Sequence, residues 1–182
     1  MKPLIPRRIR RLGLACVFMA LAGCASMSVK ECLTADWTDQ GYRDGRSGLP
    51  ASRVEDHREA CASVGVMPDI TRYMAGRDQG ILLYCTPLNA QEEGRRGNQY
   101  RNTCPVQLEG MFLQYHRLGY RVHEAEQRLD NLDRRTRQLE RALSKEKDKT
   151  QQSRLRNELR DLDRQLRRAR DDLRFAESSL RH

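Results

Sequence analysis

The sequence predicts an all-α protein: a small disulfide-stapled helical domain followed by a long coiled-coil helical hairpin. Four cysteines lie between residues 32 and 107, and glycines and aromatic residues recur there at spacings of three and four. From residue 108 onward, leucines and other apolar residues alternate at the same spacings. Both patterns are helical, and no alternating run of β-branched residues predicts a strand.

Length and composition limit what the chain can be. Its 182 residues allow one domain, or one domain with an appendage, and exclude a large multidomain enzyme. Charged residues make up 32%, hydrophobic residues 38%, and the mean hydropathy is −0.83. A chain this polar does not bury a single core along its whole length, so part of it is expected to be extended and solvated.

The N-terminal segment has the charge pattern of an export signal. Residues 1–11 contain five basic residues and no acidic one, and residues 12–23 form a short apolar run. About a dozen apolar residues are fewer than the roughly 20 that cross a bilayer as a helix. A cleavable signal peptide is therefore predicted over residues 1–23.

The end of this segment resembles the lipobox of bacterial lipoproteins, in the run Leu21-Ala22-Gly23-Cys24. The resemblance implies that Cys24 is acylated and that residues 24–31 form a lipidated N-terminus and short linker. Ala25 stands where an Asp would retain such a protein in the inner membrane, so an outer-membrane anchor facing the periplasm is expected. An ordinary signal peptide with a chance cysteine is the alternative.

Charge is unevenly divided along the chain. Removing the signal peptide takes away five cations and no anion, so the net charge falls from +9 to +4. Residues 24–107 carry ten basic and eleven acidic residues, whereas residues 108–182 carry nineteen and fourteen. The basic excess therefore lies on the C-terminal segment, and nucleic acid is not expected as a partner of an exported protein.

The cysteines indicate an oxidising compartment. With Cys16 in the signal peptide and Cys24 acylated, an even set of four remains: Cys32, Cys61, Cys85 and Cys104. Two disulfides are expected in a small exported domain. Three connectivities are open, and pairing of neighbours along the chain is favoured because shorter loops close at lower entropic cost. A zinc site is the competing interpretation, but no C-x₂-C pair occurs and no metal is predicted.

Three glycine-aromatic stretches between residues 37 and 100 resemble one another, and each is expected to place its glycines on one helix face. Helices with such a face can pack closely together. The alternative is a surface that binds a glycan or peptide. Its candidate residues are Asp36, Trp37, Asp44, Tyr73, Arg77, Tyr84 and Tyr100. That alternative requires the aromatic rings to converge on one cleft.

Local signals divide this domain into helices. Ser52 and Glu55 have the spacing of a capping box, and the helix they start is expected to cover residues 54–64 and stop at Gly65. A second helix is expected over residues 69–84. His57 lies four residues before Cys61, and we expect a surface histidine beside a disulfide rather than a nucleophile and its base.

An ordered set of fragments carries a resemblance to a known family. The fragments are ECLTADW (31–37), GYRDGRSG (41–48), HREACASVGVMPD (57–69), YMAGRDQG (73–80), YCTPLN (84–89), GRRGNQY (94–100) and CP (104–105). In this order they resemble the bacterial lipoprotein family called domain of unknown function 2799, over about 75 residues. Ala90 stands where that family usually has Gly. The resemblance implies an envelope lipoprotein and supplies no catalytic residue.

The C-terminal segment contains two apolar seams at heptad spacing. The first is Leu108, Met111, Tyr115, Leu118, Val122, Ala125, Leu129, Leu132, Thr136, Leu139 and Leu143. The second is Leu155, Leu159, Leu162, Leu166, Ala169, Leu173, Ala176 and Leu180. They are out of phase, so we expect an antiparallel hairpin over residues 108–182, with a turn at about 144–154.

The second seam is shorter than the first. The hairpin therefore leaves Leu108, Met111 and Tyr115 to dock on the stapled domain. One continuous helix that dimerises in parallel is the alternative, because no Gly or Pro marks the turn.

Together these features predict a lipid-anchored envelope protein that acts as a non-catalytic structural or interaction module. Its coiled coil is expected to contact another envelope protein or peptidoglycan. The alternative is a periplasmic ligand-binding or catalytic domain that uses the Trp37, Tyr73 and Tyr100 surface. No catalytic motif or cofactor-binding motif is found in the sequence, so neither enzymatic activity nor a cofactor is predicted.

Overall fold

The computed structural model describes residues 26–180. The predicted signal peptide and Cys24 lie outside these residues. The helices are α2 (Val29–Leu33), α3 (Trp37–Arg46), α4 (Arg53–Cys61), the short 3₁₀ helix η2 (Ala62–Val64), α5 (Ile70–Tyr84), α6 (Pro87–Arg95), α7 (Val106–Lys145) and α8 (Lys149–Ser179). The part of the chain that is described contains no strand, so the predicted all-α fold is confirmed.

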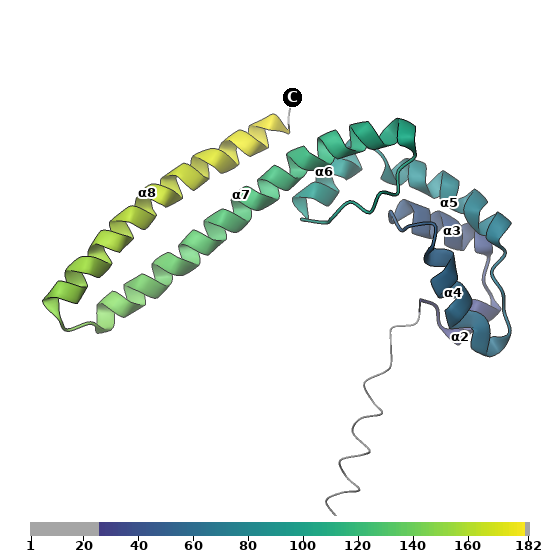
Figure 1. Cartoon of the computed structure of the whole chain (residues 1–182), viewed down its shortest axis with the longest axis horizontal. Coiled ribbons are helices and arrows are strands. Elements are labelled where there is room, and N and C mark those ends of the chain that lie inside the picture. Colours follow the sequence, from purple (N-terminus) through teal and green to yellow (C-terminus); the bar gives the residue numbers. More distant parts are fainter. Residues whose placement is uncertain (1–25, 181–182) are drawn as a thin grey trace, which may run out of the picture.

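Figure 1 shows two parts: a group of short helices from α2 to α6, and an arm made of the two long helices α7 and α8. The N-terminal half of α7 runs past α6, and its C-terminal half is paired with α8 (Figure 1). None of the helices between residues 26 and 180 combines the length and the apolar character needed to cross a membrane.

Helix ends follow ordinary capping chemistry. The Asp36 side chain accepts hydrogen bonds from the backbone of Thr38 and Asp39, and caps on α5, α6 and α8 work in the same way. The predicted stop at Gly65 is confirmed, since this residue ends η2 with a φ of 70° that favours glycine.

One predicted cap is wrong. The side chain of Ser52 makes no capping hydrogen bond, because its backbone is already helical and its hydroxyl cannot reach the first turn. A complete capping box occurs instead at Ser28 and Glu31, where α2 begins. The two helices predicted in this region otherwise match α4–η2 and α5 to within about one residue.

Glycines let α3 and α5 pack at backbone contact, as the spacing predicts. A Cβ added at Gly41 would lie 1.9 Å from the carbonyl oxygen of Tyr73, and one added at Gly76 would lie 1.8 Å from that of Thr38. Gly45 and Gly80 extend the same contact by one turn. No residue larger than glycine fits at these crossing points without separating the helices.

The third glycine-aromatic stretch behaves differently from the prediction. Helix α6 ends at Arg95, so Gly97 and Tyr100 lie in the loop that follows and do not continue a helix face. Gly94 instead meets Gly119 of α7, where an added Cβ on either residue would lie 2.2 Å or less from a carbonyl oxygen of the other helix. Ala90, which stands where the family usually has Gly, is buried inside α6.

Both disulfides join cysteines that are neighbours along the chain, as favoured from loop length. Cys32 is bonded to Cys61 and Cys85 to Cys104. Each lies in its own apolar cluster. Cluster 1 consists of Met27, Cys32, Trp37, Val54, Cys61 and Tyr73. Cluster 2 consists of Ile81, Tyr84, Cys85, Ala90 and Phe112. The small domain therefore has two cores, each closed by one covalent bond.

The C-terminal segment is the predicted antiparallel hairpin. Helix α7 has 40 residues and α8 has 31, and they are joined by residues 146–148, inside the predicted turn. All eight residues of the second seam are buried or half-buried. The side-chain amide of Gln91 in α6 lies 3.4 Å from the carbonyl oxygen of Leu180, so the end of α8 returns to the domain.

Docking of α7 on the domain differs in one respect from the prediction. Leu108 and Tyr115 pack against cluster 2 as expected, but the fully buried residue is Phe112, which lies off the predicted seam. Met111 is only half-buried. The side of α7 that packs here faces α6 and the rings of cluster 2. The apolar residues on this side are therefore shifted around the helix axis relative to those of the hairpin seam.

Candidate functional site

The predicted ligand surface is not formed as one site. Trp37 and Tyr73 lie in cluster 1, whereas Tyr84 belongs to cluster 2 and Tyr100 packs against it. The rings do not converge on one cleft, because the two clusters are separate cores. The ligand-binding alternative built on Trp37, Tyr73 and Tyr100 therefore loses its geometric basis.

The polar members of that surface have structural contacts. Asp36 is exposed and caps the N-terminus of α3. Arg77 is buried, and its Nη2 donates a 3.0 Å hydrogen bond to the carbonyl oxygen of Leu49. The first contact stabilises the start of α3, and the second holds α5 to the loop that follows α3.

Asp44 lies at the centre of a buried polar network. Its Oδ2 accepts a hydrogen bond from the hydroxyl of Tyr73 at 2.7 Å and lies 2.7 Å from Nε2 of His57. Its Oδ1 accepts a 3.0 Å hydrogen bond from Gln40. Because a carboxylate only accepts, Nε2 of His57 carries the proton toward Asp44.

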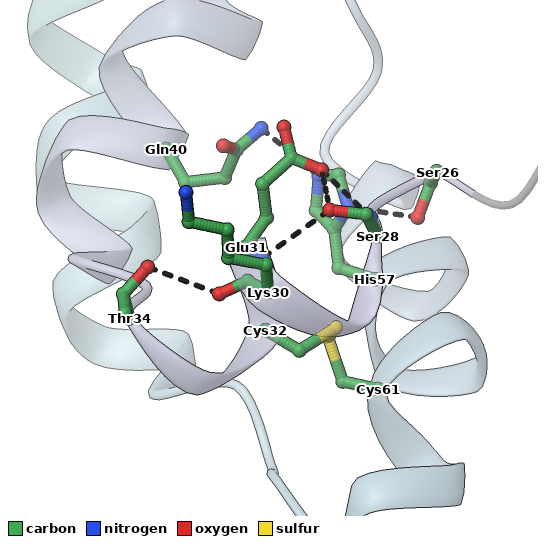
Figure 2. The surroundings of a disulfide bond; sticks show 9 residues. All are labelled: Ser26, Ser28, Lys30, Glu31, Cys32, Thr34, Gln40, His57 and Cys61. Atoms are coloured by element: carbon green, nitrogen blue, oxygen red, sulfur yellow. Dashed lines mark hydrogen bonds between the residues drawn. A yellow bond between two sulfur atoms is a disulfide. The ribbon is translucent and has the colours of Figure 1, made fainter.

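The other ring nitrogen of His57 forms a hydrogen bond with Ser26, the first residue that the structure describes. Nδ1 lies 2.9 Å from the hydroxyl of Ser26, and Figure 2 shows this contact beside the Cys32–Cys61 disulfide. His57 is only 1% exposed, so the expectation of a surface histidine is wrong. Cys61 is disulfide-bonded and supplies no thiol for a nucleophile–base pair.

The network shifts the acidity of its members. Burial raises the pKa of Asp44, but the hydrogen bonds from His57 and Tyr73 lower it more, and the net pKa lies below the ordinary value. Burial, followed by the hydrogen bond to Asp44, raises the pKa of Tyr73. Asp44 is therefore held ionised and Tyr73 neutral, which suits a structural network closed to solvent.

A polar cleft lies at the other end of the domain, where the C-terminal ends of α3 and α5 meet α6 and the loop that follows it. Its volume is about 630 Å³. The side chains that give it its chemistry are Arg46, Tyr84, Glu93, Arg96, Tyr100 and Arg101. We call this region the Arg–Tyr cleft. Two of the predicted ligand residues, Tyr84 and Tyr100, line it.

Tyr84 is the most enclosed side chain of the cleft. It is 6% exposed, and its ring stacks on Phe112 with centroids 5.1 Å apart. Gly48, which has a φ of 65°, faces the hydroxyl end of the ring, and a Cβ there would lie 2.3 Å from Cζ. Burial, and then the charge of Glu93, raises the pKa of Tyr84 to about 12. The phenol is therefore a neutral hydrogen-bond donor.

The remaining groups divide into paired and unpaired ones. Glu93 accepts hydrogen bonds from Arg96 at 3.2 Å and from Asn98 at 3.0 Å. The hydroxyl of Tyr100 accepts from the backbone of Cys104 and donates to Glu109. Among the described residues, neither Arg46 nor Arg101 forms an ion pair.

Sequence reasoning missed the basic members of this cleft. Arg46, Arg96 and Arg101 come from different segments, and only the fold brings them beside Tyr84. The one local signal was the pair of arginines between two glycines at residues 94–97, which reads as a solvated helix end.

Comparison with known proteins identifies the central part of the chain. No curated protein and no solved structure matches it. Residues 36–121 match the family described as protein of unknown function (DUF2799). This segment runs from the cap of α3, through both glycine crossings and the second disulfide, to the part of α7 that docks on the domain. The family assignment rests on residues 36–121, somewhat under half of the chain, and this segment belongs to the DUF2799 family.

Proposed function

We propose that this protein is a lipid-anchored envelope lipoprotein that acts without catalysis, as a structural or interaction module. In this proposal residues 1–23 are a cleaved signal peptide, Cys24 is acylated, and the mature protein faces the periplasm from the outer membrane. The two disulfides support an oxidising compartment. The lipobox-like run before Cys24 supports the anchor.

The first described residues support a short, fixed tether. Ser26 contacts His57, and Met27 is 6% exposed inside cluster 1. Only one residue therefore separates Cys24 from chain that is packed on the domain. An acyl chain at Cys24 would hold the α2 end of the domain against the membrane. Val29 and Leu33, one turn apart on α2, are 53% and 63% exposed and would meet the lipid headgroups.

The observation that carries the interaction role is the arm. Beyond the part of α7 that docks on α6, the main packing partners of α7 and α8 are each other. Twenty-three residues of helix beyond Val122 extend about 35 Å at 1.5 Å per residue. This part of the arm adds nothing to the cores of the domain, so we assign it to contact with another envelope protein or with peptidoglycan.

Labelling tests the anchor. Cells grown with a palmitate analogue are expected to mark the wild-type protein and to leave a Cys24→Ser variant unmarked. An unmarked wild-type protein, or equal marking of both, would contradict the lipoprotein assignment.

Photocrosslinking in cells tests the arm. A photoreactive residue in place of Arg137 or Lys147 is expected to capture one or a few defined partners, because both positions are exposed on the arm. The matched control is Glu55, which is exposed on α4 of the domain. Arm positions that capture nothing, or the same products as the control, would contradict the proposed role.

A further inference from the structure

The hydroxyl of Tyr84 is the unusual group of the Arg–Tyr cleft. The residue is 6% exposed, and its ring is fixed between Phe112 and Gly48. Its hydroxyl makes no hydrogen bond with another residue of the described chain, and at neutral pH it carries its proton. A phenol that lines the cleft and donates to no other described residue is available to an acceptor supplied from outside.

The charges of the cleft favour an anion. Arg46, Arg96 and Arg101 oppose the single carboxylate of Glu93, and Arg96 already pairs with it. Two guanidinium groups and one phenol therefore remain as donors. Guanidinium groups bind carboxylates and phosphates through paired N–H donors. These donors suit either anion, and the neutral amide groups beside them decide between a carboxylate and a phosphate.

The amide side chains add acceptors next to these donors. The amide nitrogen of Asn89 donates to the carbonyl oxygen of Tyr84, and that of Asn98 donates to Glu93. Neither amide oxygen makes a hydrogen bond with another described residue, so both are available to accept from a ligand. The ring of Tyr84 is covered by Phe112, as is that of Tyr100, with ring centroids 5.1 and 5.0 Å apart, so neither ring offers two free faces to a sugar.

From this arrangement we propose that the Arg–Tyr cleft binds the carboxylate end of a short peptide. The hydroxyl of Tyr84 and the guanidinium groups of Arg46 and Arg101 hold the carboxylate, and the amide oxygens of Asn89 and Asn98 accept from peptide N–H groups. The cleft volume of about 630 Å³ holds a peptide end of this size. The proposal does not depend on the lipid anchor or on the arm.

Titration of the purified full chain in detergent, followed by NMR, tests this binding. N-acetyl-alanyl-alanine with a free carboxylate is expected to shift the signals of residues that line the cleft, and to saturate. The C-terminal amide of the same peptide is expected to bind about tenfold more weakly, because it lacks the charge. Equal binding of acid and amide, or no saturable binding of the acid, would overturn the proposal. So would inorganic phosphate that binds more tightly than the peptide.

Two variants locate the contact. Tyr84→Phe removes only the unused hydroxyl and keeps the ring on Phe112, and Arg101→Gln removes one unpaired cation. Each is expected to weaken peptide binding about five- to tenfold with an unchanged melting temperature. Arg170→Gln, an exposed cation on α8, is the matched control and is expected to bind as the wild type does. Wild-type affinity in Tyr84→Phe and Arg101→Gln would overturn the proposal.

Discussion

At the scale of single residues, the most consequential group is the carboxylate of Asp44. It joins three segments, because its partners are Gln40 on its own helix, His57 on α4 and Tyr73 on α5. It is 6% exposed, so it cannot exchange these partners for water. A buried charge with every partner in place fixes one arrangement of the surrounding helices.

The lowered pKa of Asp44 predicts a specific dependence of stability on pH. In the unfolded chain an aspartate titrates near about 3.9, and the folded-state pKa lies below its ordinary value. The stabilisation is therefore present above about pH 4 and is lost as the pH falls through the folded-state pKa. Asp44→Asn is expected to lower the free energy of unfolding at pH 7 by about 2–4 kcal/mol and to flatten this acid dependence.

Urea unfolding at pH 7, 4 and 3 measures that dependence. Asp78→Asn, at an exposed position on α5, is the matched control and is expected to keep the wild-type curve. An Asp44→Asn variant with the same acid slope as the wild type would show that the network does not set it.

The residue scale is also where prediction from sequence was weakest. His57 was expected on the surface, because nothing local marks it as a partner of Asp44, which lies 13 residues earlier on another helix. Tyr84 and Tyr100, two of the candidate ligand residues, line one cleft. Their grouping with Trp37 and Tyr73 was wrong, because residue type and spacing do not tell which of two cores a ring enters.

At the scale of elements, the glycine crossings determine how the helices pack. The α3–α5 contact brings the two backbones together at both Gly41 and Gly76. This feature was predictable, because spacings of three and four fix which residues share a helix face whatever the rest of the fold does. The partner of Gly94 was not predictable, since Gly119 has no second glycine three or four residues away in the long helix α7.

Two glycine-to-alanine substitutions are expected to have opposite effects. Gly76→Ala would place a Cβ 1.8 Å from the carbonyl oxygen of Thr38, so we expect a loss of about 2–4 kcal/mol of stability. Gly110→Ala in α7 meets no atom within 4 Å and is expected to gain about 0.5–1 kcal/mol from helix propensity. Thermal unfolding compares them, and a gain in both variants would contradict the close packing.

The disulfides predict a second pair of effects. Replacing Cys85 and Cys104 together by Ala is expected to cost about 2–4 kcal/mol, because a loop of 19 residues is no longer closed in the unfolded chain. The same change should disorder the loop that carries Tyr100, whose hydroxyl accepts from the backbone of Cys104.

Hydrogen exchange across residues 96–105 measures this loosening. Replacing Cys32 and Cys61 by Ala is the matched control, because that disulfide lies in the other cluster. Equal protection of this loop in both double variants would contradict the assignment of one disulfide to each core.

At the scale of the whole molecule, the described chain divides into a domain held by two disulfides and an arm held by the pairing of two apolar seams. The division was predictable from sequence, because the seam runs far beyond what a small domain can bury. The burial of Phe112 was not predictable, because the rings around Tyr84 determine which face of α7 packs on the domain.

The hairpin, unlike a parallel dimer of continuous helices, closes within one chain. Its melting temperature is therefore expected to be independent of protein concentration.

Leu166→Ala is expected to destabilise the arm by about 2–4 kcal/mol, because this side chain is 6% exposed in the seam. Phe175→Ala on the same helix, 71% exposed, is the control and should change little. Thermal unfolding followed by circular dichroism measures both predictions, the first of them over a hundredfold range of protein concentration.

The contact between Gln91 and Leu180 has a practical meaning for locating the protein in cells. A fluorescent reporter fused after α8 would sit beside α6, close to the domain, and would reveal little about where the arm points. The same reporter inserted between α7 and α8, at residues 146–148, would mark the far tip. A comparison of the two fusions would therefore report the distance and direction from the domain to the tip of the arm.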